Sequence, residues 1–387
     1  MPEGANGKWS LAWLATAVAG LLSTWFALGI AGSGPAQAAG APPPPWHSQT
    51  LPGTAPGDEL KAVSCSSATF CMAVGDQLIQ GPDYQYESAV AEAWNGTKWR
   101  PVAMANPSGG ASESDFYVIG AVSCVSRTAC VAVGNVEGRT LLHTLAEVWN
   151  GTTWRTTAAV AAGNEPALAS VSCVSATDCM AVGDYTQIGT ARGRALAEKW
   201  NGTSWTRTLH SSTVASLGTV SCPSASLCFA GGRMLSGIER WNGQRWTLTA
   251  TNAVTAPLLS CASTHHCLAV GCPNSGTCLR SGLQNSYAWN GSTWRQVTTN
   301  GAKRQNLLQS LSCVSATSCT AVGGLEGSTT AVAARWNGHD WTLQRDPGGA
   351  SGLSLWTVSC VATACEAIGQ VPVPHNYGQP TAIRSGS

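Results

Sequence analysis

Seven copies of one motif fill most of this 387-residue chain, and no other feature constrains its fold as strongly. The first half of each copy is Ser-Cys, a short turn sequence, a second Cys and a short apolar run that ends in Gly. The copies begin at Cys65, Cys124, Cys173, Cys222, Cys261, Cys313 and Cys360. A unit repeated so often is expected to be one structural building block.

The second half of the motif is Trp-Asn-Gly-x-x-Trp, which occurs six times. Its tryptophan pairs are Trp94/Trp99, Trp149/Trp154, Trp200/Trp205, Trp241/Trp246, Trp289/Trp294 and Trp336/Trp341. The seventh copy reaches Ser387 without such a pair, whereas a lone Trp46 stands 19 residues before Cys65. Trp154 has the same spacing to Cys173. Trp46 is therefore predicted to supply the missing last strand of the seventh copy, so that the two ends of the chain close a ring.

Each copy contains four short runs rich in Val, Thr, Ala and Trp and bounded by turn residues, which is typical of β-strands. In the third copy these runs, labelled a to d in chain order, cover residues 169–173, 179–183, 195–200 and 204–208. The period is about 49 residues, and periods of roughly 40 to 50 with strand content indicate propeller blades. The sequence predicts an all-β, seven-bladed β-propeller over residues 46–387, with four-stranded blades.

The Asn-Gly pair between strands c and d predicts a two-residue type I′ turn, because this turn needs positive φ at both central residues. In the third copy it would place Trp200 opposite Thr203 and Glu198 opposite Trp205, with both indole rings on one face of the hairpin. Since the pair recurs in every complete copy, the tryptophans are expected to pack between neighbouring blades. A sugar-stacking surface is the alternative.

Sixteen cysteines at repeated spacings predict local disulfides. The predicted pairs are Cys65–Cys71, Cys124–Cys130, Cys173–Cys179, Cys222–Cys228, Cys261–Cys267, Cys272–Cys278, Cys313–Cys319 and Cys360–Cys365. Seven of these pairs close the a–b hairpins, and the pair at Cys272 lies in the b–c loop of the fifth copy. His265 and His266 stand between two of these cysteines, but no equivalent pair carries histidines, so a disulfide is preferred to a metal site.

The first 38 residues are predicted to be a secretory signal peptide. Lys8 precedes an apolar stretch over residues 9–31, and Ala36 and Ala38 offer the small residues of a cleavage site. Residues 39–45 would be a Pro-rich linker. The stretch is long enough to span a bilayer, so an uncleaved anchor is the alternative. The mature protein is expected to be extracellular, monomeric and not inserted in a membrane, with association with the cell surface as an option.

Charged residues are 11% of the chain and the net charge is +1, which argues against nucleic acid as a partner. No cofactor, metal ligand set or catalytic residue is predicted. A partner, if there is one, is expected to be an extracellular glycan or protein.

The segment from Cys228 to Trp246 resembles a kelch repeat: Gly231-Gly232 end strand b, and Trp241 and Trp246 flank the c–d turn. Gly323-Gly324 with Trp336 and Trp341 shows the same pattern. The first aromatic is Trp where kelch repeats have Tyr, and the spacing is shorter. The turn also resembles the Asp-box of sialidase-type propellers, without its Asp. From Trp46 onward the chain is similar to secreted repeat proteins of high-GC bacteria. The resemblance implies a propeller and is nearly silent on chemistry.

In a propeller, the a–b and c–d turns lie on one face and the d–a and b–c loops on the other, here called the d–a/b–c face. The loops of the d–a/b–c face vary most in length; Gly75 and Trp94 are 19 residues apart, for example, but Gly232 and Trp241 only 9. Variable loops on a rigid scaffold commonly carry binding sites. The candidate ligand-binding residues are non-repeating aromatics in these loops near the junction of blades seven and one: Trp356, Tyr377, Tyr84 and Tyr86.

Three functions remain open. The first is a binding module for a glycan, a cell-wall polymer or a protein. The second is a carbohydrate-active enzyme, which the resemblance allows, since kelch and Asp-box propellers host such enzymes. Asp76 and Asp184, each just after strand b, would be the acid–base candidates, although turn residues at strand ends are the commoner case. The third is a structural protein of the cell envelope. Fold alone does not decide among these three functions.

Overall fold

The computed structural model describes residues 45–80, 85–105, 116–137, 142–158, 160, 163–190, 193–208, 215–232, 237–250, 255–272, 286–297, 306–325, 330–373 and 378–386. All the described residues belong to one compact unit, Pro44–Ser387. Within that unit, every regular element among the described residues is a β-strand.

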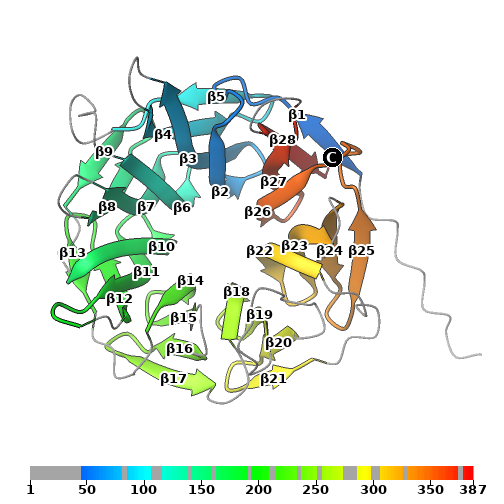
Figure 1. Ribbon diagram of the computed structural model, residues 1–387. Helices are drawn as coiled ribbons and strands as arrows, with labels where there is room; N and C mark the ends of the chain where they lie inside the picture. Colours follow the sequence, from blue (N-terminus) through cyan, green and yellow to red (C-terminus); the bar gives the residue numbers. More distant parts are fainter. Residues whose placement is uncertain are drawn as a thin grey trace, which may run out of the picture. The chain divides into compact units, whose positions relative to one another are not determined.

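The strands form seven four-stranded antiparallel sheets, arranged as blades around a common centre (Figure 1). Blades one to four are β2 (Glu59–Ser67), β3 (Phe70–Gln80), β4 (Gln85–Trp94), β5 (Trp99–Val102); β6 (Phe116–Ser126), β7 (Ala129–Glu137), β8 (Leu142–Trp149), β9 (Trp154–Thr157); β10 (Asn164–Ser175), β11 (Asp178–Thr186), β12 (Gly193–Trp200), β13 (Trp205–Arg207); and β14 (Leu217–Ser224), β15 (Leu227–Gly232), β16 (Ile238–Trp241), β17 (Trp246–Ala250). Blades five to seven are β18 (Thr255–Ser263), β19 (His266–Cys272), β20 (Ser286–Trp289), β21 (Trp294–Gln296); β22 (Asn306–Ser315), β23 (Ser318–Leu325), β24 (Ala331–Trp336), β25 (Trp341–Arg345); and β26 (Ser354–Val361), β27 (Ala364–Val371), β28 (Gln379–Ser385), β1 (Trp46–Gln49). The predicted seven-bladed propeller is confirmed.

The ring closes as the position of Trp46 predicts. Strand β1 pairs with β28, with Trp46 opposite Ser385 and Gln49 opposite Ala382. Trp46 is buried at the interface between blades six and seven. Gln49 accepts a hydrogen bond from the indole of Trp99 at 2.8 Å and so ties the closing strand to blade one as well.

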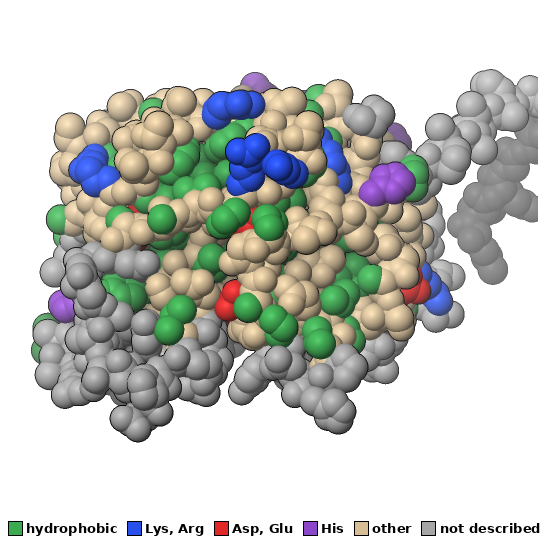
Figure 2. Space-filling view, turned by 90° about the horizontal axis from the view of Figure 1, so that it is seen from above, with side chains coloured by type: hydrophobic (Ala, Val, Ile, Leu, Met, Phe, Trp, Pro, Cys, Tyr) green, Lys and Arg blue, Asp and Glu red, His purple; other side chains and the backbone are tan. Residues whose placement is uncertain are grey.

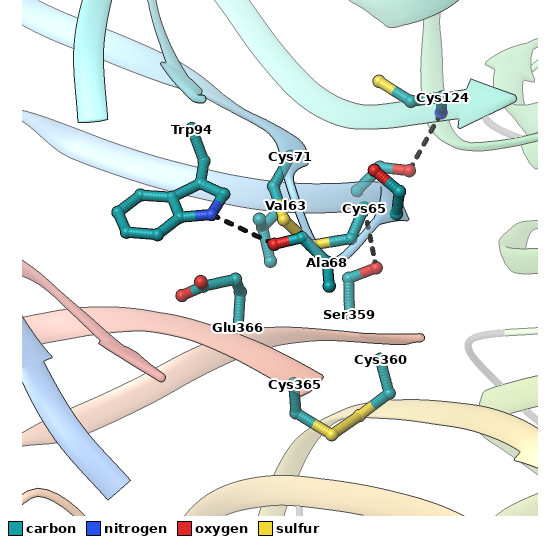
Figure 3. Close-up of a disulfide and its surroundings, with 12 residues drawn as sticks. Val63, Cys65, Ala68, Cys71, Trp94, Cys124, Ser359, Cys360, Cys365 and Glu366 are labelled. Carbon is teal, nitrogen blue, oxygen red and sulfur yellow. Dashed lines mark hydrogen bonds between the residues drawn. A yellow bond between two sulfur atoms is a disulfide. The ribbon is translucent and has the colours of Figure 1, made fainter. Parts of the chain in front are cut away.

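The serine before the first cysteine links each blade to the next. Its Oγ accepts a hydrogen bond from the backbone N–H of the equivalent cysteine in the following blade, as in the bond from Cys124 to Ser64 at 2.9 Å. All seven bonds are present at 2.9–3.0 Å, including the one from Cys65 to Ser359 that crosses the closure (Figure 3). The repeated Ser-Cys dipeptide therefore builds a continuous ring of hydrogen bonds around the innermost strands.

The tryptophan pairs pack between blades as predicted, but the turn between them differs from the prediction. Trp200 lies directly opposite Trp205, and Glu198 lies opposite Arg207, so the turn contains four residues. Gly202 alone takes positive φ, at 97°. The side chain of Asn201 accepts hydrogen bonds from the N–H groups of residues 203 and 204 at 2.9 Å, which stabilises the longer turn in place of type I′.

Seven disulfides close the seven a–b hairpins at the pairs that the spacing predicts. His265 and His266 are exposed beside one of them, and no group of metal-ligating side chains occurs among the described residues. Cys272 ends β19, but its side chain and Cys278 lie outside what the structure describes, so that pair stays a prediction. Disulfides in this number are typical of an oxidising compartment.

A β-bulge near the start of each innermost strand explains the glycine that ends the short apolar run of strand b. In blade two the register shifts between Ile119 and Ala121, which leaves Gly120 without a partner on β7. The displaced backbone crosses close to Gly134, where a Cβ atom would lie 1.9 Å from the carbonyl oxygen of Val118. The same contact recurs at Gly75, Gly183 and Gly369. The glycine is therefore a packing requirement of the bulge.

Candidate binding face

The bulge residues form a set at the centre of the ring, toward the d–a/b–c face. We call this set the bulge ring: Lys61, Gly120, Ala169, Gly218, Gln309 and Trp356, with the matching irregularity of blade five between Thr255 and Leu258. A bulge residue has no partner across the ladder, so its side chain can turn away from the sheet. Because these strands are innermost, the bulge ring borders the centre of the propeller (Figure 1).

Trp356 and Lys61 occupy this position in adjacent blades. Both side chains are half-buried, although Leu355 and Leu60 beside them are 1% and 0% exposed. Strands β26 and β2 pack together, and the N–H of Val63 donates to the hydroxyl of Thr357 at 3.3 Å. The indole and the ammonium group therefore come from neighbouring strands at the same level of the ring.

Lys61 forms an ion pair with Asp76, whose other carboxylate oxygen accepts the N–H of Ile119 in blade two at 2.8 Å. Burial raises the pKa of Asp76 to about 6, and the Lys61 ammonium opposes that rise. Asp184 accepts a hydrogen bond from the hydroxyl of Ser216 at 3.1 Å, again toward the following blade. These two acidic residues thus join neighbouring blades. They lie within β3 and β11, and not just after strand b as predicted, because both strands continue beyond them in register with strand c.

Buried glutamates in strand c hold the incoming d–a loops. Glu92, Glu147 and Glu198 are each 0% exposed. They accept hydrogen bonds from the backbone N–H groups of Gly53, Ala105 and Val160, which follow strand d of the preceding blade. These acceptors attach the beginning of three d–a loops to strand c of the following blade.

We expect Glu198→Gln to gain stability relative to the unaltered protein as the pH rises from 5 to 8. Burial raises the pKa of Glu198 from 4.5 to about 7 in the folded state. A carboxyl group whose pKa is higher in the folded than in the unfolded protein stabilises the fold. This contribution is complete at pH values below the pKa of the unfolded protein, and it is lost as the pH rises toward 7. The amide does not titrate, and one unit of pKa difference corresponds to about 1.4 kcal/mol. Thermal unfolding at several pH values measures the effect.

The exposed Glu165→Gln serves as the control, with no change in relative stability expected across this range. A constant difference between Glu198→Gln and the unaltered protein from pH 5 to 8 would contradict the prediction.

The structure describes only some of the four aromatic residues that were predicted to bind a ligand. Trp356 lies in the bulge ring. Tyr86 lies in β4, but its side chain is outside what the structure describes. Tyr84 and Tyr377 lie outside the described residues. The site at these four residues therefore stays a prediction. Sequence reasoning did not assign a role to Lys61, although the repeat alignment makes it the counterpart of Trp356.

Charged side chains are sparse on the outer surface that Figure 2 shows, where apolar and uncharged polar atoms dominate and Lys and Arg gather near one rim. Within the described ranges, we find no helix with the length and apolarity needed to cross a membrane.

No protein-family model matches the chain, and no curated protein is significantly similar to it. Solved structures of other propellers are similar in fold. YCF48 from Cyanidioschyzon merolae has a TM-score of 0.54 at 13% identity, over 88% of this chain and 98% of that one. A catalytically inactive virginiamycin B lyase from Staphylococcus aureus with quinupristin has a TM-score of 0.56 at 6% identity, over 87% and 98%. Sqt1 from Chaetomium thermophilum, bound to the N-terminus of the ribosomal protein L10, has a TM-score of 0.50 at 9% identity, over 89% and 100%.

Proposed function

We propose that this chain is a secreted binding protein that takes a protein partner on its d–a/b–c face, at the junction of blades seven and one. The observation that carries this proposal is the half-buried Trp356 beside the ion pair of Lys61 and Asp76 in the bulge ring. A rigid aromatic ring next to a polar group is typical of the residues that contribute most to protein interfaces.

Two further observations support the proposal. The disulfides and the predicted signal peptide both favour an extracellular protein. Sqt1, a propeller of similar fold, binds a polypeptide segment. A glycan stacked on Trp356 is the alternative ligand. An enzyme is disfavoured, because both acid–base candidates are engaged in contacts to the neighbouring blade.

Trp356→Ala is expected to abolish partner binding and to lower stability by less than about 3 kcal/mol, the lower end of the cost for a fully buried Trp. Peptides selected on the unaltered protein from a displayed random library serve as the probe, alongside an array of glycans and cell-wall fragments. Affinity and thermal unfolding are measured on the same samples. Lys61→Ala should weaken binding as well.

Gln309→Ala is the matched control, since Gln309 holds the equivalent bulge position in blade six. It should leave peptide binding unchanged. Peptides that bind Trp356→Ala as tightly as the unaltered protein would contradict the proposed face. Ligands found on the glycan array alone would contradict the protein partner.

A further inference from the structure

On the opposite face, made by the a–b and c–d turns, three blades cover a tryptophan of the next blade with their own arginine. The three arginines occupy equivalent positions in strand c. The second cysteine of each blade pairs with a residue of strand c, and the arginine is the residue just before it: Arg240, Arg335 and Arg384. Their guanidinium groups lie 5.9 Å from the ring of Trp289, 5.9 Å from that of Trp46 and 5.1 Å from that of Trp94. These are cation–π distances.

The guanidinium groups of Arg384 and Arg335 also donate hydrogen bonds there. Arg384 donates to the carbonyl oxygen of Ala68 at 2.7 Å. The same oxygen accepts the indole N–H of Trp94 at 3.3 Å (Figure 3). Arg335 donates to the hydroxyl of Ser385 at 2.7 Å. The interface between two blades thus offers both an aromatic face and an oxygen to a guanidinium.

Blade five has Ala288 at the arginine position, opposite Leu268 on strand b. A pocket of about 330 Å³ opens here between blades five and six, lined among others by Ala288, Leu268, Ala316 and Trp336. Between blades six and seven, where Arg335 is present, the corresponding pocket measures about 120 Å³. The pocket thus lies where an arginine side chain would have been.

The acceptor is retained in this pocket. The carbonyl oxygen of Ala316 corresponds to that of Ala68 and accepts the indole N–H of Trp336 at 3.2 Å. Blade one also has an alanine at the arginine position, but Phe70 is buried there and Arg127 lies over its ring. At the position of Phe70, blade five has the exposed His266, which leaves the space open.

We propose that the pocket between blades five and six binds an arginine side chain of a partner polypeptide, with the guanidinium over Trp336 and donating to Ala316 O. In blades four, six and seven, the protein's own arginine supplies the guanidinium group. At blade five, the partner polypeptide would supply it. Arg295 lies opposite Ala288 in the strand register, but it is exposed and is not among the residues that line the pocket. This site is on the other face from the proposed function and does not depend on it.

The experiment titrates the ¹⁵N-labelled protein with Nα-acetyl-arginine methylamide and follows the indole N–H signal of Trp336. The citrulline analogue has the same shape without the charge. We expect the arginine probe to bind at least on the order of tenfold more tightly than the citrulline probe, since the charge supplies the cation–π attraction.

Ala288→Arg should place an arginine from the protein itself in the pocket and abolish binding of the probe. Ala288→Leu should also abolish it by filling the space, and it keeps the test decisive if the arginine variant does not fold. Thr97→Arg adds the same charge at an exposed c–d turn of blade one and should leave binding unchanged.

Equal binding of the arginine and citrulline probes would overturn the proposal, as would unaltered binding to both Ala288 variants. If Arg295→Gln bound the arginine probe tenfold or more tightly than the unaltered protein, Arg295 would be the occupant, and a partner arginine would be excluded.

Discussion

A chain that lacks residues 39–55 is expected to lose most of its stability, even though over 330 residues of the propeller remain. The deletion removes β1 and its pairing with β28, and with it the buried side chains of Trp46 and Leu51. Loss of a buried Trp alone costs about 3–5 kcal/mol, which is a large share of the stability of a typical domain. The deletion would also expose the unpaired edge of β28. Denaturant unfolding of the shortened protein measures the loss.

A chain that begins at Pro45 is the control, because it retains the closing strand, and it should unfold like a chain that begins at Ala39. Trp46→Ala should fall between the two. If the deletion of 39–55 unfolded at the same denaturant concentration as the control, the closing strand would not be needed to hold the ring together.

Gly134→Ala is expected to destabilise the protein by about 3 kcal/mol or more, at the upper end of what overpacking costs. The new Cβ would lie 1.9 Å from the carbonyl oxygen of Val118, in the bulged strand of the same blade. Since that atom belongs to the backbone, relief requires the bulge itself to move. The midpoint of denaturant unfolding, with an unchanged slope, measures the effect.

Gly120→Ala provides a matched control in the same blade. Gly120 is the bulge residue, and the nearest atom to its added Cβ is the carbonyl oxygen of Leu168 at 3.8 Å. We expect a change within about 0.5 kcal/mol, as for most substitutions without a clash. A loss for Gly134→Ala no larger than that for Gly120→Ala would show that the bulge does not require glycine there.

The ring could be predicted from the sequence because it depends on counting. The spacing of Trp46 to Cys65 repeats that of Trp154 to Cys173, and this spacing alone predicts that Trp46 lies in the last strand of blade seven. The length of the turn between the tryptophans could not be predicted from the sequence, because Asn-Gly is compatible with two turn lengths. The four-residue turn is stabilised by the side chain of Asn201, which accepts hydrogen bonds from two backbone N–H groups.

The candidate sites show a similar limit. The repeat alignment singled out Trp356, but the ion pair of Lys61 with Asp76 depends on a bulge. The glycine of strand b recurs in the sequence, but it indicates a bulge only when its contact with the neighbouring strand is known. The pocket at Ala288 becomes visible only when the strand register places Ala288 level with Arg240, Arg335 and Arg384. Arg240 and Arg335 each precede a tryptophan in the sequence and Arg384 precedes Ser385, but the ring that each arginine covers belongs to another blade.

The hydrogen bonds from each Cys N–H to the Ser Oγ of the preceding blade form a cycle with no first or last member. In a linear repeat protein, the terminal repeats have one neighbour and can fray, so unfolding can proceed from an end. Here each blade has two neighbours, and the opening of one interface leaves the two blades beside it still held on their other sides. The seven repeats should therefore behave as one cooperative unit, with few partly unfolded forms that a protease could cut.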